Sequence, residues 1–498
     1  MLTAPIEEST STRLSLRDPA GALFRSDSRL IRVVKPSAAA AIRRVLESPT
    51  CEFFTRNGSL PKTTVLAGEE LAKARQTLNA DDLGGEQAIY LEHEQLPFPS
   101  FPHEWSSEML AAAAGLTLDL AERLLPEGLG LKDATPFNVL FRATEPVFVD
   151  LLSIEQRNLH DATWLPYAQF VRTFLTPLLV NRYFRIPLGD IFLARREGLR
   201  PHDAYPLVGF FQRLRQPFFS LVTIPMWLSR PGKRFQVAAP EKRLVHAPEK
   251  ARFILGALIG HLRVLLRKIC SKRSNADSIW TRYMSQSLPY SPEEFQAKEE
   301  CISDYLQDYR PRTVLDIGCN TGHFSEMAAL AGAAVVAIDV DSEVVGKVWE
   351  RARKRKLNIL PLVVNLTRPS PAVGWQNRES ASFLDRAHAK FDTVFALAVL
   401  HHMLYDERIP LDEVLVALAN LTRSDVVVEL VERGDISVRD FLRSHGPEVE
   451  CVDQSIFELK AGRLFEILEK QTIPGTERTI YTLRKLNAEK IQPSNSTC

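Results

Sequence analysis

The chain has 498 residues, with 62 lysines and arginines against 61 aspartates and glutamates and a formal net charge of +1. At about 100–200 residues per domain, this length predicts two or three domains. Hydrophobic residues make up 45% of the chain and charged residues 25%, which is typical of globular proteins and excludes collagen-like, coiled-coil and wholly disordered chains. Because the charges balance, the composition excludes general nucleic-acid binding, and an anionic partner would need a local basic patch.

The cysteines and the apolar stretches predict a cytoplasmic protein without a transmembrane segment. The six cysteines form no CxxC pair, which argues against a structural zinc site and against a disulfide framework. The N-terminus carries Glu7 and Glu8 and lacks the apolar core of a secretory signal. The most apolar stretches, at 218–228 and 253–266, are shorter than the roughly 18–20 residues that span a bilayer.

The first half of the chain predicts a mixed α+β domain over residues 25–229. Residues 1–24 are polar and rich in serine and threonine, which predicts a disordered tail. Beyond this tail, the residue patterns predict strands at 30–34 and 146–150 and helices at 38–46 and 107–125. Residues 207–228 are rich in phenylalanine and leucine, and they predict a buried helix broken at Pro217 and Pro225.

Residues 230–279 predict a basic linker that leads into an amphipathic helix. The many lysines and arginines between 230 and 273 are opposed only by Glu241 and Glu249. One interpretation is a solvated connector. The other is a local binding patch for an anionic ligand, such as a substrate, lipid headgroups or nucleic acid.

Strands and helices alternate over residues 280–486. The expected strands lie at 313–317, 334–339, 359–364, 391–399 and 425–430, with helices at 322–330 and 343–355. This order predicts an α/β domain with a Rossmann-like, doubly wound and mainly parallel sheet. Residues 487–498 are expected to form a polar tail.

A glycine-rich turn lies where the first strand of this domain meets its helix. Residues 314–324 read VLDIGCNTGHF, and Gly318 and Gly322 are placed where a missing side chain lets a ligand approach the backbone. The next strand ends in Asp339, which can accept hydrogen bonds from ribose hydroxyls. A dinucleotide is the usual ligand of such a turn. Asp316, however, would repel a pyrophosphate and suits the cationic end of a ligand.

These segments resemble the class I S-adenosylmethionine-dependent methyltransferases. DIGCNTG is similar to the first motif of that family and AIDVD to the second, and FDTVFALAVLHH resembles its fourth strand. The resemblance implies S-adenosylmethionine as the cofactor, and it implies as binding residues Asp316, Gly318, Asn320, Gly322, Asp339 and Asn365. Within this set Asn320 replaces a glycine that is common in the family. The alternative is a Rossmann-like domain that binds a nucleotide or no ligand.

Two histidines are candidate catalytic residues. His401 and His402 follow the fourth strand, at the edge of the sheet where ligands bind. A neutral imidazole there could take a proton from a hydroxyl acceptor, whereas the alternative is packing at the strand end. Glu429 and Glu432 could join the histidines in a metal site, but no metal-ligand spacing supports this, and no metal is expected.

The residues that precede the first strand could form a lid over the cofactor. The resemblance implies an N-terminal helical lid in which an aromatic residue or a lysine contacts the cofactor. The candidates are Trp280, Tyr283, Tyr290 and Lys298. Ordinary core packing is the alternative for the aromatic residues.

The first half contains a second set of polar residues. The segment LKDATPFNVLF, followed by VFVD, resembles the catalytic loop and the metal-binding aspartate of the protein-kinase and aminoglycoside-phosphotransferase fold. In that pattern Asp133, Asn138 and Asp150 would share cations bound to a triphosphate. No glycine-rich phosphate loop precedes them, and Lys35 is the candidate phosphate-binding lysine. We therefore expect a degenerate kinase-like domain.

Together the two halves resemble a group of bacterial two-part methyltransferases that includes a rhizobial host-specific nodulation protein. The resemblance implies methyl transfer to a small-molecule, glycan or glycolipid acceptor in nodulation signalling. Two alternatives remain open. One is a kinase or bifunctional enzyme that uses Asp133, Asn138 and Asp150, and the other is a non-catalytic regulatory protein that binds S-adenosylmethionine.

Overall fold

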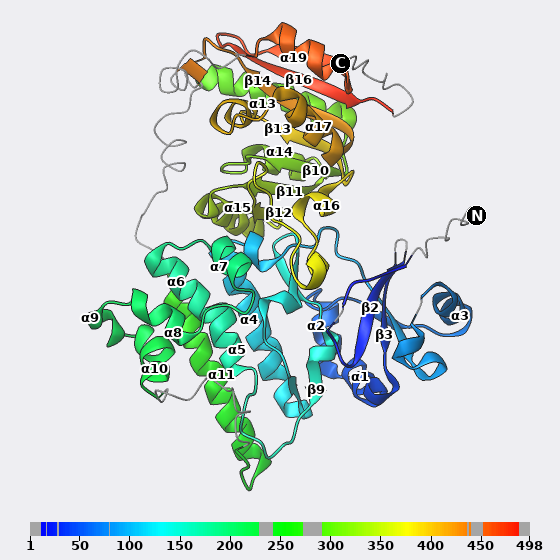
Figure 1. Cartoon of the computed structure of the whole chain (residues 1–498), viewed down its shortest axis with the longest axis vertical. Coiled ribbons are helices and arrows are strands. Elements are labelled where there is room, and N and C mark those ends of the chain that lie inside the picture. The colour runs from blue at the N-terminus through cyan, green and yellow to red at the C-terminus, as the bar shows by residue number, and fades with distance from the viewer. Residues whose placement is uncertain are drawn as a thin grey trace, which may run out of the picture. The chain divides into compact units, whose positions relative to one another are not determined.

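The computed structural model describes residues 11–15, 17–26, 29–78, 80–228, 243–271, 291–435, 438–439 and 452–487. The chain divides into two compact units (Figure 1). The N-terminal unit comprises Met1–Lys272 and Ala372–Ser380, and the C-terminal unit comprises Arg273–Pro371 and Ala381–Cys498. Trp280, Tyr283, Tyr290 and the polar tail from residue 488 lie outside the described residues, as do residues 230–242 and 272–279 of the predicted linker.

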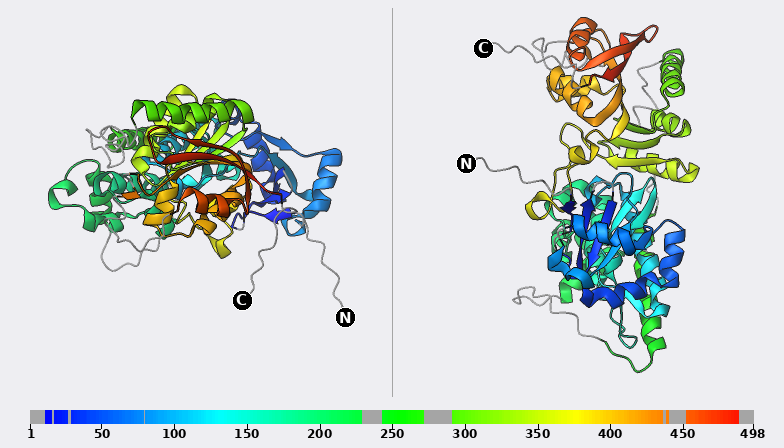
Figure 2. Two further views of the ribbon diagram at one scale, coloured as in Figure 1. Left: turned by 90° about the horizontal axis from the view of Figure 1, so that it is seen from above. Right: turned by 90° about the vertical axis from the view of Figure 1, so that its right-hand side faces the viewer.

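The N-terminal unit begins with a five-stranded antiparallel sheet, drawn in blue in Figure 2. Its order is β1-β2-β3-β5-β4, and the strands are β1 (Ser11–Arg13), β2 (Gly21–Ser26), β3 (Arg29–Val34), β4 (Thr63–Val65) and β5 (Ile89–His93). Its core contains Phe24, Ile31, Val33 and Tyr90. Most residues of β2 and the last four residues of β3 are buried, so this part of the sheet is covered.

The expected disordered tail is wrong for part of its length. β1 and β2 lie within the region 1–24 that the polar composition assigned to it. Ala22 and Phe24 are buried in the sheet, and β2 pairs with β3 from Gly21 to Ser26. Pairing with a neighbouring strand satisfies the backbone, which composition alone does not reveal.

Helices and two short two-stranded antiparallel sheets complete the N-terminal unit. Strands β6 (Leu129–Leu131) and β9 (Ile154–Gln156) pair, as do β7 (Val139–Arg142) and β8 (Glu145–Phe148). The longest helices are α4 (Ser107–Leu124) and α11 (Pro248–Cys270), which pack against each other. The remaining helices are α1 (Ala39–Leu46), α2 (Pro49–Arg56), α3 (Gly68–Thr77), α5 (Tyr167–Phe170), η8 (Val171–Leu175), α6 (Thr176–Phe184), α7 (Leu188–Ala194), α8 (Pro201–Ala204), η9 (Tyr205–Leu207), α9 (Phe210–Arg213), η10 (Phe219–Thr223) and α10 (Ile224–Leu228), with short 3₁₀ turns η1 (Pro36–Ala38), η2 (Asp81–Leu83), η3 (Gly85–Gln87), η4 (Pro102–Glu104), η5 (Leu125–Glu127), η6 (Pro136–Asn138) and η7 (Leu151–Ser153).

Two helical predictions for this unit have different outcomes. The amphipathic helix after the linker is confirmed, because α11 buries Leu255, Ile259 and Leu262 along one face. The buried helix predicted at 207–228, with breaks at Pro217 and Pro225, is confirmed only in part. A helical run, η10 and α10, follows Pro217 and buries Leu221 and Val222, but it continues through Pro225. The segment forms several short helical pieces, and Phe210 and Phe211 are exposed.

The C-terminal unit is built on a seven-stranded sheet of order β12-β11-β10-β13-β14-β16-β15. The strands are β10 (Thr313–Ile317), β11 (Ala334–Asp339), β12 (Ile359–Val363), β13 (Phe391–Ala396), β14 (Thr422–Val431), β15 (Phe465–Thr472) and β16 (Arg478–Lys485), and the helices are α13 (Pro292–Tyr309), α14 (His323–Leu330), α15 (Ser342–Arg355), α16 (Phe383–Ala387), η12 (His402–Asp406), α17 (Leu411–Leu421) and α19 (Gln454–Ala461). The 3₁₀ turn η11 (Trp375–Asn377) belongs to the N-terminal unit. Strands β10 to β14 pair in parallel, whereas β16 is antiparallel to β14 and to β15. The predicted parallel α/β sheet is therefore confirmed, and the antiparallel hairpin β15–β16 was not predicted.

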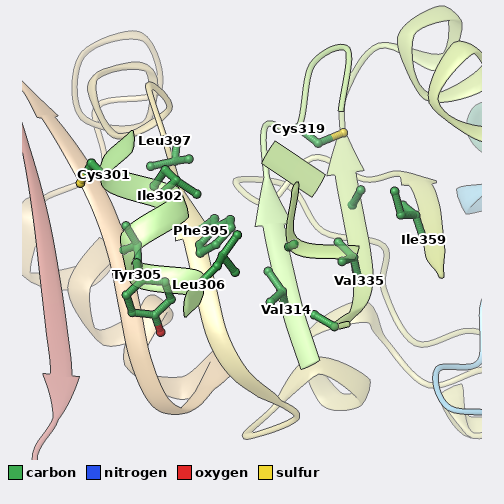
Figure 3. Close-up of a cluster of buried hydrophobic side chains, with 14 of the residues drawn as sticks. Cys301, Ile302, Tyr305, Leu306, Val314, Cys319, Val335, Ile359, Phe395 and Leu397 are labelled. Atoms are coloured by element: carbon green, nitrogen blue, oxygen red, sulfur yellow. The ribbon is translucent and has the colours of Figure 1, made fainter. Parts of the chain in front are cut away.

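The sheet has apolar residues on its inner strands because helices cover it. Val314 on β10, Val335 on β11 and Phe395 on β13 are buried in one core. Helix α13 adds Ile302 and Tyr305 to this core (Figure 3). This packing fixes the carboxyl ends of the parallel strands, where ligands bind in such sheets.

Candidate functional site

A cavity of about 430 Å³ lies in the C-terminal unit, at the carboxyl ends of the parallel strands. Its volume lies within the range of small-molecule sites. Of the residues that the sequence singled out in this unit, those that line the cavity are Lys298, Asp316, Gly318, Asn320, Asp339, Asn365, His401 and His402. The structure therefore brings together side chains from helix α13 and from the ends of four strands.

The turn after β10 needs residues that tolerate a left-handed backbone. Gly318 has φ +68° and Asn320 has φ +46°, a region in which asparagine is the most tolerated residue after glycine. A Cβ atom on Gly318 would lie 3.2 Å from Cγ2 of Val399, so a side chain there would crowd the cavity wall. The positive φ of Asn320 explains why asparagine can replace glycine at this position.

Gly322 supports the turn from outside the cavity. It has φ +76° and immediately precedes α14, and it does not line the cavity. A Cβ atom on Gly322 would lie 2.9 Å from Cγ2 of Val348 on α15. The glycine therefore allows α14 to begin close to α15.

Asp316 lies at the end of β10 and is almost completely buried. The hydroxyl of Ser325 donates to its Oδ2 at 2.5 Å. Burial raises the pKa of Asp316 to about 7, although the Ser325 hydrogen bond and the charge of Lys298 lower it in part. The carboxyl thus lies in the cavity wall with its charge poorly solvated.

Asp339 ends β11 and holds two loops together. Its Oδ2 accepts a hydrogen bond from the backbone N–H of Asn320 at 2.9 Å, and its Oδ1 accepts one from that of Asp341 at 3.0 Å. Burial raises the pKa of Asp339, and these backbone bonds oppose the shift. The carboxylate is therefore fixed in orientation at the cavity wall.

Asn365 follows β12 and is oriented by its own turn. Its Oδ1 accepts hydrogen bonds from the backbone N–H of Thr367 at 2.9 Å and from the hydroxyl of Thr367 at 2.7 Å. This arrangement is an Asx-type turn. It leaves the side-chain amide at the part of the cavity that the end of β12 forms.

The two histidines differ in their surroundings. His401 is buried, and its Nδ1 has no hydrogen-bond partner among the residues that the structure describes. Burial lowers the pKa of His401 to about 3, so its imidazole is neutral. His402 is half-exposed, and its Nδ1 lies 2.6 Å from Oδ2 of Asp406. The ring centroids of His401 and His402 are 4.2 Å apart.

A buried network of charged residues lies behind the histidines, and the sequence revealed it only in part. Lys298 Nζ contacts Glu429 Oε2 at 2.5 Å, and Arg478 Nη1 contacts Glu429 Oε1 at 3.2 Å. The guanidinium of Arg478 also contacts both carboxylate oxygens of Asp435, at 2.7 and 3.1 Å. Lys298 and Arg478 line the cavity, and opposite charges compensate their burial.

Glu429 and Glu432 do not form a metal site with the histidines. Glu429 belongs to the buried network, and Glu432 accepts a hydrogen bond from Gln454 at 2.5 Å. In the part of the chain that the structure describes, no group of three or more histidines, cysteines or acidic residues is placed to hold a metal ion. Arg478 was missed because a single arginine in the unpredicted strand β16 gives no signal in the sequence.

Of the three residues of the kinase-like pattern, Asp133, Asn138 and Asp150, the structure connects the last two. Asn138 Nδ2 donates to the hydroxyl of Ser153 at 3.0 Å, and that hydroxyl donates to Asp150 Oδ2 at 2.5 Å. Asp133 accepts a hydrogen bond from Gln169 at 3.3 Å. The cation at Asp150 is Arg32, whose Nη1 lies 3.4 Å from Oδ1 of Asp150.

Arg32 also joins a second carboxylate. Its Nη1 lies 3.2 Å from Oδ2 of Asp18. Lys35, the lysine that the sequence suggested, follows β3 directly and precedes the 3₁₀ turn η1. The structure thus places an arginine of β3, and not this lysine, at the carboxylate of Asp150.

Comparison with known proteins finds one relative that matches almost the whole chain and a family model that matches part of the C-terminal half. Residues 315–428 match the family model of a methyltransferase domain. Nodulation protein NoeA of Rhizobium meliloti (strain 1021) is 30% identical over 477 residues, which are 95% of this chain and 95% of that protein.

Two solved structures are similar to part of the chain. Magnesium protoporphyrin IX methyltransferase ChlM of Synechocystis PCC 6803, solved with bound SAH, is 17% identical, with coverage of 43% of this chain and 90% of that chain and a TM-score of 0.30. N-methyltransferase NodS of Bradyrhizobium japonicum WM9 is 15% identical, with coverage of 40% of this chain and 100% of that chain and a TM-score of 0.29. Among the described residues, no helix is both long enough and apolar enough to cross a membrane.

Proposed function

Because this chain belongs to the family of nodulation protein NoeA and carries a methyltransferase domain, we propose that it methylates a small-molecule, glycan or glycolipid acceptor in nodulation signalling. As a methyltransferase, it takes its methyl group from S-adenosylmethionine. The observation that carries the proposal is the cavity that joins Asp316, Asp339 and Asn365 to the two histidines. A cofactor and an acceptor must meet in one such space for an in-line methyl transfer.

The cavity wall fits the cofactor in two respects. Asn320 Oδ1 is buried and has no hydrogen-bond partner within the described chain, so it can accept a hydrogen bond from a ligand. Gly318 leaves open a space that a side chain would narrow. Both features occur at the turn after β10, where a ligand can approach the backbone.

We assign the parts of the cofactor to residues by their chemistry. Asp316 would bind the cationic amino end of the methionine part, since a nearby positive charge favours its ionised form. Asp339 would accept hydrogen bonds from the ribose hydroxyls, and Asn365 would lie beside the adenine. The bound cofactor supplies a methyl group on a positively charged sulfur, and the protein residues hold and orient the two reactants.

The two histidines would have different roles, His402 as general base and His401 in orienting the acceptor. His402 is the better general base, because Asp406 at its Nδ1 fixes the ring and would stabilise the imidazolium that forms. Buried His401 is a weak base, since its pKa is about 3. Its unpartnered Nδ1 suits it to accept a hydrogen bond that orients the acceptor hydroxyl.

Calorimetry with S-adenosylmethionine tests the cofactor site directly. We expect the wild-type chain to bind the cofactor and Asp339→Ala to weaken binding at least tenfold, because two ribose hydrogen bonds are lost. Asp339→Asn keeps an oxygen for the backbone amides and should give an intermediate loss. Asp308→Ala removes an exposed carboxylate of α13 and serves as the control. A wild-type chain that does not bind the cofactor would rule out the proposed function.

Transfer of labelled methyl groups into an extract of a deletion strain tests the catalytic assignment. His402→Ala should slow transfer by about 10²–10⁴-fold, as expected for a general base, while cofactor affinity stays within twofold of wild type. Full transfer by His402→Ala would contradict its role as the base. Cofactor binding without any methylated product would favour the regulatory alternative. Comparison of metabolites between the deletion strain and its parent would then identify the acceptor.

For the N-terminal unit we propose a kinase-like fold that lacks phosphotransfer activity. The antiparallel sheet followed by helices supports it, as does the chain of hydrogen bonds from Asn138 through Ser153 to Asp150. Arg32 supplies at Asp150 the positive charge that a metal ion would otherwise provide. Calorimetry with ATP and magnesium tests this. ATP binding that requires magnesium and is lost in Asp150→Ala would contradict the proposal and favour the bifunctional enzyme.

A further inference from the structure

The N-terminal unit exposes an unusual number of large apolar side chains on one group of short helices. The group consists of η9, α9, η10 and α10, together with α8, which contacts η9, η10 and α10 (Figure 1). We call its exposed apolar residues the aromatic patch. They are Leu207, Phe210 (70% exposed), Phe211 (79%), Leu214, Trp227 (62%) and Leu228 (76%).

The patch is exposed although the helices that carry it are well packed. Phe218, Leu221 and Val222 of the same segment are buried. The ring of Phe218 lies 4.8 Å from that of Tyr183 on α6, and the Thr223 hydroxyl donates to the backbone oxygen of Arg213 at 2.8 Å. The inner face of the group is therefore fixed, and the outer apolar residues are not core residues that failed to pack. Single exposed apolar residues are ordinary on protein surfaces, but a group of this kind marks an interaction site.

The charge of the patch indicates what it contacts. The acidic residue of these helices, Asp203 on α8, forms an ion pair with Arg195. The remaining residues, 205–228, contain Arg213 and Arg215 and no acidic residue. Arg215 is exposed, and Arg213 is held by the backbone oxygens of Val208 and Tyr205. The sequence beyond residue 228, which lies outside the described residues, continues this bias, because no acidic residue occurs before Glu241. A second copy of the chain would bring two positive patches together, and this disfavours self-association.

We propose that the aromatic patch docks the protein on the surface of an anionic lipid membrane. Exposed phenylalanine and tryptophan side chains would insert shallowly at the boundary between headgroups and acyl chains. Arg213 and Arg215 would attract the negative surface. Helices η10 and α10 have five residues each, so the contact is peripheral and does not span the bilayer. This inference is independent of the proposed methyl transfer.

Sedimentation of the full-length protein with lipid vesicles tests the proposal. We expect binding to vesicles that contain 30% phosphatidylglycerol in phosphatidylcholine, with at least tenfold weaker partitioning into phosphatidylcholine alone. The double variant Phe210→Ser/Phe211→Ser should lose at least tenfold in partitioning. Arg215→Glu should lose affinity as well, and salt should weaken wild-type binding because it screens exposed charges.

The control is the double variant Leu330→Ser/Leu459→Ser, which removes two exposed leucines of α14 and α19 in the C-terminal unit. It should bind vesicles as the wild type does, and circular dichroism should show all variants folded. Absence of vesicle binding by the wild type, or equal binding by the phenylalanine variant, would overturn the proposal. Light scattering that shows a dimer lost in Phe210→Ser/Phe211→Ser, without vesicle binding, would also overturn it and assign the patch to a second copy.

Discussion

Asp316 combines a cost in stability with its proposed use in cofactor binding. Its carboxyl is buried, and this burial raises its pKa to about 7, above the ordinary value near 4. Between these two values the folded chain holds a proton that the unfolded chain releases, so stability falls as the pH rises from about 4 to 7. The proposed binding of a cationic ligand by Asp316 would explain why the site keeps this buried carboxyl at a cost in stability.

The variant Asp316→Asn tests whether the buried carboxyl lowers stability and strengthens cofactor binding. Because an amide carries no charge to desolvate, we expect a gain of about 1–3 kcal/mol in the free energy of unfolding at pH 8, below the about 4 kcal/mol that the full pKa shift implies. The gain should be nearly lost at pH 4, where the wild-type carboxyl is protonated in the folded chain and about half protonated in the unfolded chain. Cofactor affinity should fall at pH 8, where the wild-type carboxylate is charged, and should fall less at pH 4. Urea unfolding at pH 4, 6 and 8 measures the gain.

The exposed carboxylate of Asp308 on the same unit provides the comparison. Asp308→Asn should change the free energy of unfolding by less than 0.5 kcal/mol at every pH, as surface substitutions usually do. An Asp316→Asn variant less stable than wild type at pH 8 would show that the Ser325 hydrogen bond outweighs the cost of burial.

Single residues were predictable from the sequence where a strand end placed them. Asp316, Asp339 and His401 each follow or end a predicted strand, and parallel strands end at one edge of the sheet. Arg478 was not predictable, because its partners Glu429 and Asp435 lie 49 and 43 residues away in the sequence. Pairing over such separations depends on strand order, which no local pattern reveals.

Among the elements, those with a strong local period were predicted and those fixed by packing were not. Strands β10, β11 and β12 are short apolar runs separated by amphipathic helices, and their bounds agree with the prediction to within one residue. The alternation in β15 is weak, since most of its residues are not buried. The segment 207–228 is apolar like a core helix, but its composition could not show which side faces solvent.

Helix α13 is joined to the sheet by a buried ion pair, and this contact can be tested. Lys298 on α13 contacts Glu429 on β14 at 2.5 Å, with both side chains buried. Lys298→Met keeps the length of the side chain but leaves Glu429 with less positive charge, so we expect a loss of about 2–4 kcal/mol in the free energy of unfolding. Arg478, which still contacts Glu429 in the variant, keeps the loss below that of an isolated buried charge.

The surface pair Lys470–Glu458 is the matched control for this variant. Its Nζ–Oε1 distance is 2.6 Å, and both side chains are half-exposed. Lys470→Met should cost less than about 1 kcal/mol, because solvent screens the pair. Equal losses in the two lysine variants, measured by urea unfolding, would contradict the structural role of the buried pair.

In the molecule as a whole, the length predicted more than one domain, and each of the two units has its own hydrophobic core. The core that contains Phe24 and Tyr90 lies in the N-terminal sheet, and the core that contains Tyr305 and Phe395 lies in the C-terminal unit. The sequence predicted this division because its composition and periodicity change between the halves. It could not predict that the segment Ala372–Ser380 belongs to the N-terminal unit, since this segment has no distinctive sequence pattern.

Two separate cores predict two thermal transitions, of which the cofactor raises only one. A ligand at 100 times its dissociation constant stabilises the unit that binds it by about 2.7 kcal/mol. For a unit of about 200 residues this raises the midpoint of unfolding by roughly 5–10 °C. Calorimetry of the full-length chain with S-adenosylmethionine should therefore shift one transition and leave the other in place. The shifted transition should be the one that Lys298→Met lowers, and Asp339→Ala should abolish the shift. A single transition that moves as a whole would instead mean that the two units unfold together, so that binding in the C-terminal unit also stabilises the N-terminal one.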